Sequence, residues 1–325
     1  MLTDSFGRFH DYLRIALTER CNLRCTYCMP EEGVMLSPKS YLLSYEEIFR
    51  LAQILVRHGV SKIRLTGGEP LVRKDVTMLI SGLAQLDGLK TLAMTTNGWL
   101  LNRKIAELKA AGLHHLNISL DTLRAERFRE ITRRDAFRPT MQGIEAALAH
   151  GFEPLKINCV VMRGVNDDEL VDFVAWTAQQ PIEVRFIEYM PFGGNRWADT
   201  RFMAFEEMKQ RIERHFSLKK LPVEPNETAK RYRVSGFVGT VGFITSMTEA
   251  FCASCNRIRL TADGHLKMCL HGASEVNLRD MMRAGATDAE IAAMIGAAVQ
   301  RKKAEHAGLY QLVDQENRPM ILIGG

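Results

Sequence analysis

The sequence contains no long apolar segment, and this absence limits where the protein can act. Its longest apolar run, Ile291–Val299, is far shorter than the roughly 18 residues needed to span a bilayer. The first residues also lack the basic stretch and apolar core of a secretory signal peptide. We therefore expect a cytoplasmic protein with no membrane partner.

The sequence also lacks the features of a disulfide-rich scaffold or of a nucleic-acid-binding protein. It has seven cysteines, and an odd number in a chain of 325 residues without a signal peptide argues against a disulfide framework. The formal net charge is only +5, and the basic residues are scattered, with Arg301–Lys303 as the one short run. A nucleic-acid-binding face would instead be continuous, basic and interleaved with aromatic residues. We expect no nucleic acid as partner.

The first 190 residues alternate between short apolar segments and amphipathic helical segments. Six such βα units predict a parallel, TIM-like barrel of the (β/α)6 type, incomplete because a closed barrel needs eight. The expected strands are Tyr12–Leu17, Lys62–Thr66, Thr91–Thr95, His115–Leu120, Leu155–Val161 and Glu183–Glu188. The expected helices are Tyr45–His58, Asn102–Ala111, Thr140–His150 and Asp168–Gln179.

After Met190 the pattern changes to an α+β arrangement. A helix is expected at Ala204–Phe216, followed by a linker that contains Pro222 and Pro225. Short strands are expected near Tyr232–Val234, Val238–Thr245, Arg257–Thr261 and His265–Cys269, and helices at Val276–Arg283 and Asp288–Arg301. We predict two domains, 1–220 and 221–325, in which the C-terminal α+β domain closes the mouth of the barrel.

Six of the seven cysteines form two groups. The first, Cys21, Cys25 and Cys28, has the spacing C-x3-C-x2-C in a loop directly after the first expected strand. Three thiolates from one loop suit three corners of a four-iron, four-sulfur cluster, whose fourth iron then stays open to a small molecule. A zinc site is the alternative, but structural zinc needs four ligands and no fourth Cys or His lies nearby.

The stretch 20–30, Arg-Cys-Asn-Leu-Arg-Cys-Thr-Tyr-Cys-Met-Pro, resembles the signature of radical S-adenosylmethionine (SAM) enzymes. In that family the open iron binds SAM, which is cleaved to methionine and a 5'-deoxyadenosyl radical. The turn Gly67-Gly68-Glu69-Pro70 after the second strand resembles the family's GGEP motif, which contacts SAM. Thr95–Gly98 and Ser119–Asp121 end the third and fourth strands at the same edge, where barrel enzymes hold their active sites.

The second group, Cys252, Cys255 and Cys269, has the spacing C-x2-C-x13-C and again lacks an obvious fourth ligand. A second open [4Fe–4S] cluster is the favoured interpretation, and a zinc knuckle that uses His265 or His271 is the alternative. Cys159 lies inside an apolar strand and is expected to be a buried core residue.

Two cysteine groups at these spacings resemble the GTP 3',8-cyclase family of molybdenum cofactor biosynthesis over essentially the whole chain. Further segments that carry the resemblance are Leu13–Ile15, Lys62–Arg64, Asn166–Asp168, Arg185–Met190, Cys255–Leu260 and Ile323–Gly325. The segment Ala16–Glu19 departs from the Ser-Val-Thr-Asp run that the family leads us to expect, at no predicted ligand. The resemblance implies two [4Fe–4S] clusters and SAM as cofactors.

The resemblance also implies a reaction and a set of site residues. The radical would take hydrogen from C3' of GTP, the resulting carbon radical would attack C8, and one-electron reduction would give (8S)-3',8-cyclo-7,8-dihydroguanosine 5'-triphosphate. Guanine would lie against the open iron of the second cluster. The implied SAM contacts are Tyr27, Gly68, Ser119 and Met190. The implied GTP contacts are Arg14, Arg64, Thr95, Lys156, Arg257 and Arg259, of which the last two are also implied as catalytic residues, with Gly324 and Gly325.

The charge of GTP fits these residues. The sequence has no G-x4-G-K-[ST] loop, so the phosphates would have to be held by side chains. Lysine and arginine inside barrel strands need a buried anionic partner, and Arg offers bidentate contacts to phosphate. Lys62 and Arg185 are further cations on these strands.

Partners and alternatives complete the prediction. The family implies a homodimer, a reductant such as flavodoxin or ferredoxin, transfer of the product to cyclic pyranopterin monophosphate synthase, and a flexible Gly-Gly tail that reaches into the active site. The alternative enzyme is a radical SAM peptide-modifying protein with an auxiliary cluster. The alternative outside enzymes is a metal-cluster protein that binds nucleic acid.

Overall fold

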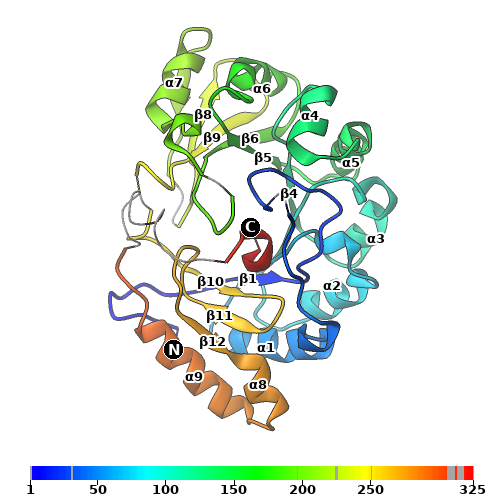
Figure 1. The fold of residues 1–325 in the computed structure, drawn as a ribbon, viewed down its shortest axis with the longest axis vertical. Coiled ribbons are helices and arrows are strands. Elements are labelled where there is room, and N and C mark those ends of the chain that lie inside the picture. Colours follow the sequence, from blue (N-terminus) through cyan, green and yellow to red (C-terminus); the bar gives the residue numbers. More distant parts are fainter. Residues whose placement is uncertain are drawn as a thin grey trace.

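The computed structural model describes residues 2–30, 32–195, 197–223, 226–249, 251–305, 312 and 318–324. In these parts of the chain a 12-stranded sheet has the order β12-β11-β10-β1-β2-β3-β4-β5-β6-β9-β8-β7 (Figure 1). The strands are β1 (Tyr12–Ala16), β2 (Lys62–Thr66), β3 (Thr91–Thr96), β4 (His115–Ser119), β5 (Leu155–Val161), β6 (Ile182–Glu188), β7 (Leu218–Lys220), β8 (Lys230–Val234), β9 (Thr240–Ile244), β10 (Arg257–Leu260), β11 (His265–Lys267) and β12 (Glu275–Asn277).

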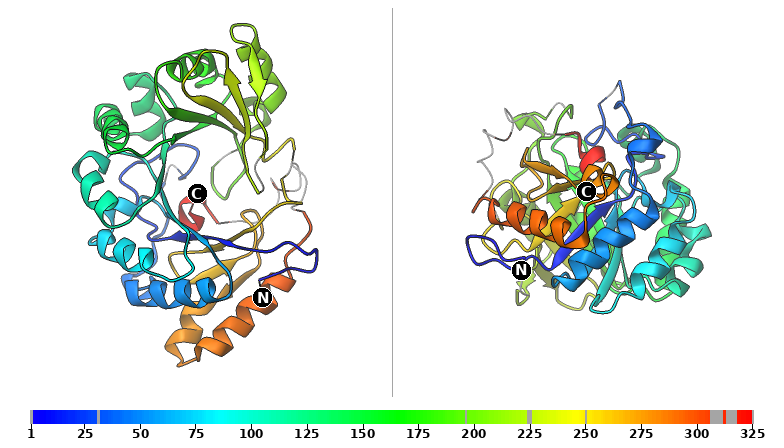
Figure 2. Two further views of the ribbon diagram at one scale, coloured as in Figure 1. Left: turned by 180° about the vertical axis from the view of Figure 1, so that it is seen from behind. Right: turned by 90° about the horizontal axis from the view of Figure 1, so that it is seen from below.

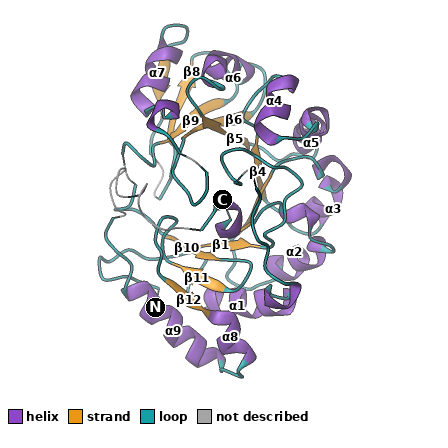
Figure 3. Cartoon of the chain, viewed as in Figure 1, coloured by secondary structure: helices purple, strands orange, loops and turns teal. Residues whose placement is uncertain are grey.

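Helices cover the outer face of the curved sheet, as Figures 1 and 3 show. The α-helices are α1 (Tyr45–Arg57), α2 (Val76–Ala84), α3 (Ile105–Ala110), α4 (Ala125–Thr132), α5 (Phe137–Ala149), α6 (Leu170–Trp176), α7 (Phe205–Glu213), α8 (Leu278–Arg283), α9 (Asp288–Gln300) and α11 (Met320–Ile323). Short 3-10 turns are η1 (Lys39–Tyr41), η2 (Pro70–Val72), η3 (Leu101–Arg103), η4 (Asp167–Glu169) and η5 (Asp199–Arg201). In the described parts of the chain, none of the helices has the length and apolar character that crossing a bilayer requires.

The six predicted barrel strands are present as β1 to β6, and each is parallel to the next. The two faces of this sheet differ. Leu13 and Ile15 of β1 are fully buried in the apolar core beneath the helices. Tyr12 and Arg14 alternate with them and therefore point to the inner face, because successive side chains of a strand point in opposite directions. A parallel sheet is ordinarily apolar on both faces, so a charged inner face indicates a binding site.

The strands beyond residue 220 join the same sheet at both of its edges. β10 pairs in parallel with β1, and β9 pairs in parallel with β6. The strands next to the predicted domain boundary, β7 and β8, pair with each other. The division at residue 220, and the closing of the barrel mouth by a C-terminal domain, stay predictions.

The end of the described chain returns to the middle of the barrel. Figure 1 and the left view of Figure 2 place α11, in red, inside the curve of the sheet, away from the outer helices. Ile321 and Ile323 of this helix are buried. The C-terminal segment is thus positioned to take part in a site on the inner face.

Candidate active site

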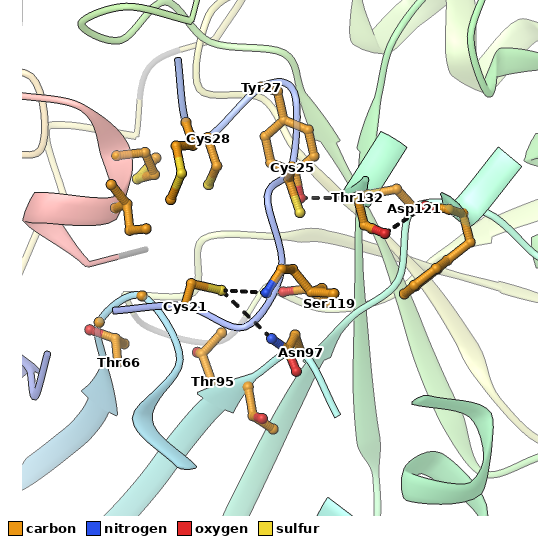
Figure 4. Close-up of a pocket in the computed structure, with 18 residues that line it drawn as sticks. Cys21, Cys25, Tyr27, Cys28, Thr66, Thr95, Asn97, Ser119, Asp121 and Thr132 are labelled. Carbon is orange, nitrogen blue, oxygen red and sulfur yellow. Dashed lines mark hydrogen bonds between the residues drawn. The ribbon is translucent and has the colours of Figure 1, made fainter. Parts of the chain in front are cut away.

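The first cysteine group lies over the carboxyl ends of β1 to β4 (Figure 4). Its loop follows β1, and the cavity beneath it has a volume of about 790 Å³, open to solvent. The cavity is lined by the three cysteines, by both glycines of the GGEP turn and by polar residues at the ends of β2, β3 and β4. These residues include Cys21, Cys25, Tyr27, Cys28, Gly67, Gly68, Thr95, Asn97, Ser119 and Asp121, together with Met320 and Ile321 of α11.

The strand ends hold the cysteine loop in place. Asn97 Nδ2 donates to Asn22 Oδ1 at 2.8 Å and lies 3.8 Å from Cys21 Sγ. The Tyr27 hydroxyl donates to Asp121 Oδ2 at 2.8 Å, and Asp121 Oδ1 accepts from the amide of Val160. The loop is therefore fixed by the ends of β3 and β4, and its three thiols have a defined position.

The GGEP turn needs glycine because it touches the backbone of the cysteine loop. A Cβ on Gly68 would lie 2.4 Å from the carbonyl oxygen of Arg20. A Cβ on Gly67 would lie 2.6 Å from the carbonyl oxygen of Thr18, and its φ of +136° also favours glycine. The buried Glu69 fixes the turn to the neighbouring strand end, because its carboxylate accepts from the Thr96 hydroxyl at 2.8 Å and from the Asn97 amide at 2.7 Å.

The three thiols fit an iron–sulfur cluster. Burial raises the pKa of Cys21 to about 11, and burial together with Cys21 raises the pKa of Cys28 to about 12. Thiolates at these positions therefore require a bound metal that supplies positive charge. Among the described residues, no group of three or more Cys, His, Asp or Glu side chains converges on a single metal ion. A cluster differs from a single ion in that each thiolate binds a different iron.

A band of cations crosses the inner face of the barrel. The register aligns Arg259 of β10 with Arg14 of β1, and Arg14 with Arg64 of β2. Two residues towards the amino ends of these strands, Arg257 aligns with Tyr12, and Tyr12 aligns with Lys62. Side chains at aligned positions of neighbouring parallel strands share a face, so both rows point into the barrel.

Tyr12 lies at the centre of this band. The Arg64 Nε donates to the Tyr12 hydroxyl at 2.6 Å, and the Lys62 ammonium lies 4.8 Å from the ring centroid. Arg64 is 4% exposed and also approaches the Thr95 hydroxyl, at 3.4 Å. The Nε of Arg14 is buried without a partner among the described atoms. Arg14, Lys62 and Arg64 thus meet around one tyrosine, an arrangement that favours the binding of an anion.

Lys156 of β5 extends the cationic face to the far side of the barrel. Burial and the nearby Arg185 lower the pKa of Lys156 to about 8. Arg185, two residues further along the face on β6, pairs with the carboxylate of Glu183. Lys156 is thus the member of the set whose charge is most sensitive to pH near neutrality.

The second cysteine group lies at the opposite end of the same strands. Cys252 and Cys255 precede β10, and Cys269 follows the antiparallel β11, so all three lie at the amino end of β10 and line one pocket. Although burial raises the pKa of the Cys255 thiol, Arg257 and Lys302 outweigh it and lower this pKa to about 6. The cationic rows therefore lie between the two cysteine groups, separated by strands about 16 Å long at roughly 3.3 Å per residue.

The C-terminal tail enters the cationic band. Arg259 Nη1 donates to the carbonyl oxygen of Gly324 at 2.8 Å. Gly324 packs so tightly on β1 and β2 that a Cβ would lie 2.6 Å from Thr66 Oγ1 and 2.8 Å from Ala16 Cβ. Gly325 lies outside the described residues.

Most of the predicted site residues lie together inside the barrel, but the structure differs from the prediction at a few of them. Tyr27, Gly68, Ser119 and Thr95 line the cavity with the first cysteines, whereas Met190 is not among its lining residues. The carbonyl oxygen of Met190, at the end of β6, accepts from Asn195 Nδ2. Cys159 is buried in the core, as predicted. Asn97 and Asp121 line the same cavity, at the strand ends where the sequence placed the active site. The sequence interpretation missed Tyr12 as a site residue, although its alternation with Arg14 was a usable signal.

Comparison with known proteins gives two family matches that together cover most of the chain. The radical SAM superfamily matches residues 15–177, and the family described as Molybdenum Cofactor Synthesis C matches residues 182–308. Among solved structures, Streptococcus suis SuiB bound to precursor peptide SuiA has a TM-score of 0.60 at 15% identity, over 97% of this chain and 76% of that one. This likeness concerns the fold alone and confirms the incomplete barrel.

Two curated relatives are much more similar in sequence. Molybdenum cofactor biosynthesis protein 1 of Bos taurus is 57% identical over 323 residues, which are 99% of this chain and 51% of that protein. The chain thus spans about half the length of that relative. The mitochondrial GTP 3',8-cyclase of Arabidopsis thaliana is 55% identical over 326 residues, with 100% of this chain and 84% of that protein covered.

These matches confirm the family that the cysteine loop and the GGEP turn predicted, and with it SAM and iron–sulfur clusters as the cofactors. The chain belongs to the radical SAM superfamily and, within it, to the family that contains molybdenum cofactor biosynthesis protein 1 and GTP 3',8-cyclase.

Proposed function

We propose that the chain is a radical SAM GTP 3',8-cyclase. It converts GTP to (8S)-3',8-cyclo-7,8-dihydroguanosine 5'-triphosphate, the first step of molybdenum cofactor biosynthesis. The similarity to a GTP 3',8-cyclase over the whole of this chain supports this proposal. The single structural observation that carries it is the cationic band between the two cysteine groups. The strands β1, β2 and β10, which supply the two central rows, contain no Asp or Glu, whereas Lys156 on β5 lies beside Glu183 of β6. A polyanion such as a nucleoside triphosphate is the partner that would balance the cations of the two rows.

Each set of residues has a role in this proposal. Cys21, Cys25 and Cys28 hold the first cluster, and Tyr27, Gly68, Ser119 and Met190 bind SAM. Arg14, Arg64, Lys156, Arg257 and Arg259 bind and orient GTP together with Thr95, and Cys252, Cys255 and Cys269 hold the second cluster, at which guanine binds. When bound, SAM and the first cluster supply the 5'-deoxyadenosyl radical that starts the reaction.

The position of GTP decides which hydrogen is removed. An arginine guanidinium group holds phosphate oxygens in fixed directions through paired N–H donors. The rows that contain Arg14 and Arg259 therefore fix the ribose relative to the end of the barrel where SAM binds. Gly324 fills the space beside Arg259, and the tail to which it belongs keeps water away from the reacting atoms, because a radical must be shielded from side reactions.

Partners beyond GTP stay predictions. These are a homodimer, a flavodoxin or ferredoxin as reductant, and cyclic pyranopterin monophosphate synthase as the receiver of the product. Cytoplasmic location is likewise a prediction, and one close relative is named as mitochondrial.

The proposal is tested by an anaerobic assay of the purified, reconstituted protein with SAM, a chemical reductant and GTP. We expect 5'-deoxyadenosine together with a cyclised guanosine triphosphate, with GTP as the sole further substrate. A protein that cleaves SAM productively only with a peptide would instead be a peptide-modifying enzyme. A colourless protein that contains zinc would contradict any radical SAM activity.

The affinity for GTP is expected to depend on pH through Lys156. Its ammonium attracts phosphate, and its pKa without GTP is about 8. Bound phosphate favours the charged form and raises this pKa. The contribution of Lys156 is therefore fully present below about pH 7 and is lost as pH rises through 8 and beyond. Calorimetric titration with GTP should show that the affinity weakens from pH 7 to pH 9. In Lys156→Arg, which stays charged, the affinity should depend less on pH.

The same dependence of GTP affinity on pH in both proteins would show that Lys156 is not part of the GTP site.

Deletion of Gly324 and Gly325 is expected to leave the fold and both clusters intact, since two terminal glycines bury little apolar surface. Product formation should fall severely while GTP still binds, because the Arg259 contact and the shielding of the site are lost. Gly324→Val should act in the same direction, since its side chain has no room beside Thr66. Turnover unchanged in both variants would show that the tail has no part in catalysis.

A further inference from the structure

Lys302 is a buried cation at the second cysteine group, directly after α9. The residue is 6% exposed. Its Nζ lies 3.3 Å from Cys255 Sγ, 2.8 Å from the carbonyl oxygen of Arg257 and 3.5 Å from His10 Nδ1. An ammonium group has three N–H donors and no acceptor. The three neighbours therefore account for all three donors, and one of them points at the sulfur of a proposed cluster ligand.

The N-terminal segment holds this lysine in position. His10 is fully buried, and its Nε2 lies 3.0 Å from Asp4 Oδ2. A carboxylate only accepts hydrogen bonds, so Nε2 carries the proton and Nδ1 faces Lys302 as an acceptor. Asp4 is fixed in turn by Arg8, whose Nε donates to Oδ2 at 2.7 Å.

Arg8 ties the same segment to the cysteine loop itself. Its Nη1 donates to the carbonyl oxygen of Cys252 at 2.7 Å, and its Nη2 donates to the carbonyl oxygen of Lys303, also at 2.7 Å. The direction of the Lys302 side chain is thus set by groups on two other segments, 4–10 and 252–257. Such a network is more than is needed to solvate a lysine, which in most proteins points its ammonium group into water.

We propose that Lys302 is a positioning residue that acts through Cys255. Held by the Asp4–His10 pair, it donates a hydrogen bond to the sulfur of Cys255 and thereby raises the reduction potential of the cluster that this sulfur ligates. Hydrogen bonds to cluster sulfurs and nearby positive charge stabilise the reduced, more negative state, so they are among the factors that set such potentials. This inference rests on the second cluster of the proposed function.

The test is a redox titration of the reconstituted full chain, followed by electron paramagnetic resonance. The signal of the first cluster is recognised by its response to added SAM. Lys302→Met should shift the midpoint potential of the second cluster to a more negative value and leave the first cluster unchanged. Lys302→Gln should give a smaller shift, because it keeps an N–H donor. Lys303→Met removes the same charge from an exposed side chain of the same pocket that makes no hydrogen bond to Cys255; it is the matched control and should give a clearly smaller shift than Lys302→Met.

Three results would overturn the inference. These are an unchanged second midpoint in Lys302→Met with both clusters present, an equal shift in Lys303→Met, and loss of the second cluster's iron in Lys302→Met and Lys302→Gln while the fold and the first cluster stay intact. The last result would assign Lys302 to cluster assembly. A wild-type protein with only about four irons would instead contradict the second cluster, and with it the proposed function.

Discussion

Replacement of Cys21, Cys25 and Cys28 by Ala is expected to abolish SAM cleavage. These cysteines are the proposed ligands of the cluster that holds SAM, and two of the proposed SAM contacts, Gly68 and Ser119, line the same cavity. The iron content should fall by half, from about eight to about four per chain. Iron analysis and chromatography of 5'-deoxyadenosine measure both effects.

The second group gives the complementary variant. Replacement of Cys252, Cys255 and Cys269 by Ala should also halve the iron, but should leave SAM binding and uncoupled SAM cleavage detectable, because this group lies at the other end of the strands. Cys159→Ala is the control, since that thiol is buried in the core and should leave the iron content unchanged. Equal loss of SAM binding in both triple variants would contradict the division of roles between the two cysteine groups.

The double variant Arg257→Ala, Arg259→Ala is expected to lose product formation from GTP by about a hundredfold or more. Each guanidinium supplies a charge-assisted contact worth about 1.5–3 kcal/mol, and about 1.4 kcal/mol corresponds to a factor of ten. Arg259 shares its row with Arg14 and Arg64, so its loss removes the β10 end of that row. Product formation is measured in the anaerobic assay at several GTP concentrations.

The iron content and SAM binding of this double variant should not change, because neither arginine ligates metal. The matched control is Arg214→Ala, Arg233→Ala, which removes the same charge from two exposed positions, one directly after α7 and one on β8. Normal GTP turnover in the Arg257, Arg259 variant, or loss of its iron, would mean that the pair is structural and that GTP lies elsewhere.

Local sequence patterns predicted the strands of the barrel well and the helices less evenly. β2 and β5 begin and end where the pattern of apolar residues predicted. α2 was missed because Val76–Ala84 is apolar on nearly every side, so it shows no helical period. α4 was missed for the opposite reason: Ala125–Thr132 is short and half of its residues are charged, with Phe128 and Ile131 as its large buried side chains.

The site could be predicted where chemistry depends on spacing, and could not where it depends on pairing between distant strands. Cysteine spacing and the GGEP turn are local, and they identified the first cluster loop. The alignment of Arg259 with Arg14 joins strands that lie far apart in the sequence, and no local pattern specifies such a register. The same holds for Lys302, whose contacts with His10 and Cys255 become visible only in the fold.

The most direct test of the account is the transfer of a label from GTP to SAM-derived product. GTP deuterated at the ribose C3' position is incubated anaerobically with the reconstituted protein, SAM and reductant, and the 5'-deoxyadenosine is analysed by mass spectrometry. If the cationic band holds GTP with its ribose towards the SAM side, the 5'-deoxyadenosine carries deuterium and a cyclised guanosine triphosphate accumulates. Unlabelled 5'-deoxyadenosine, or label transfer that persists undiminished in the Arg257, Arg259 double variant, would contradict the account.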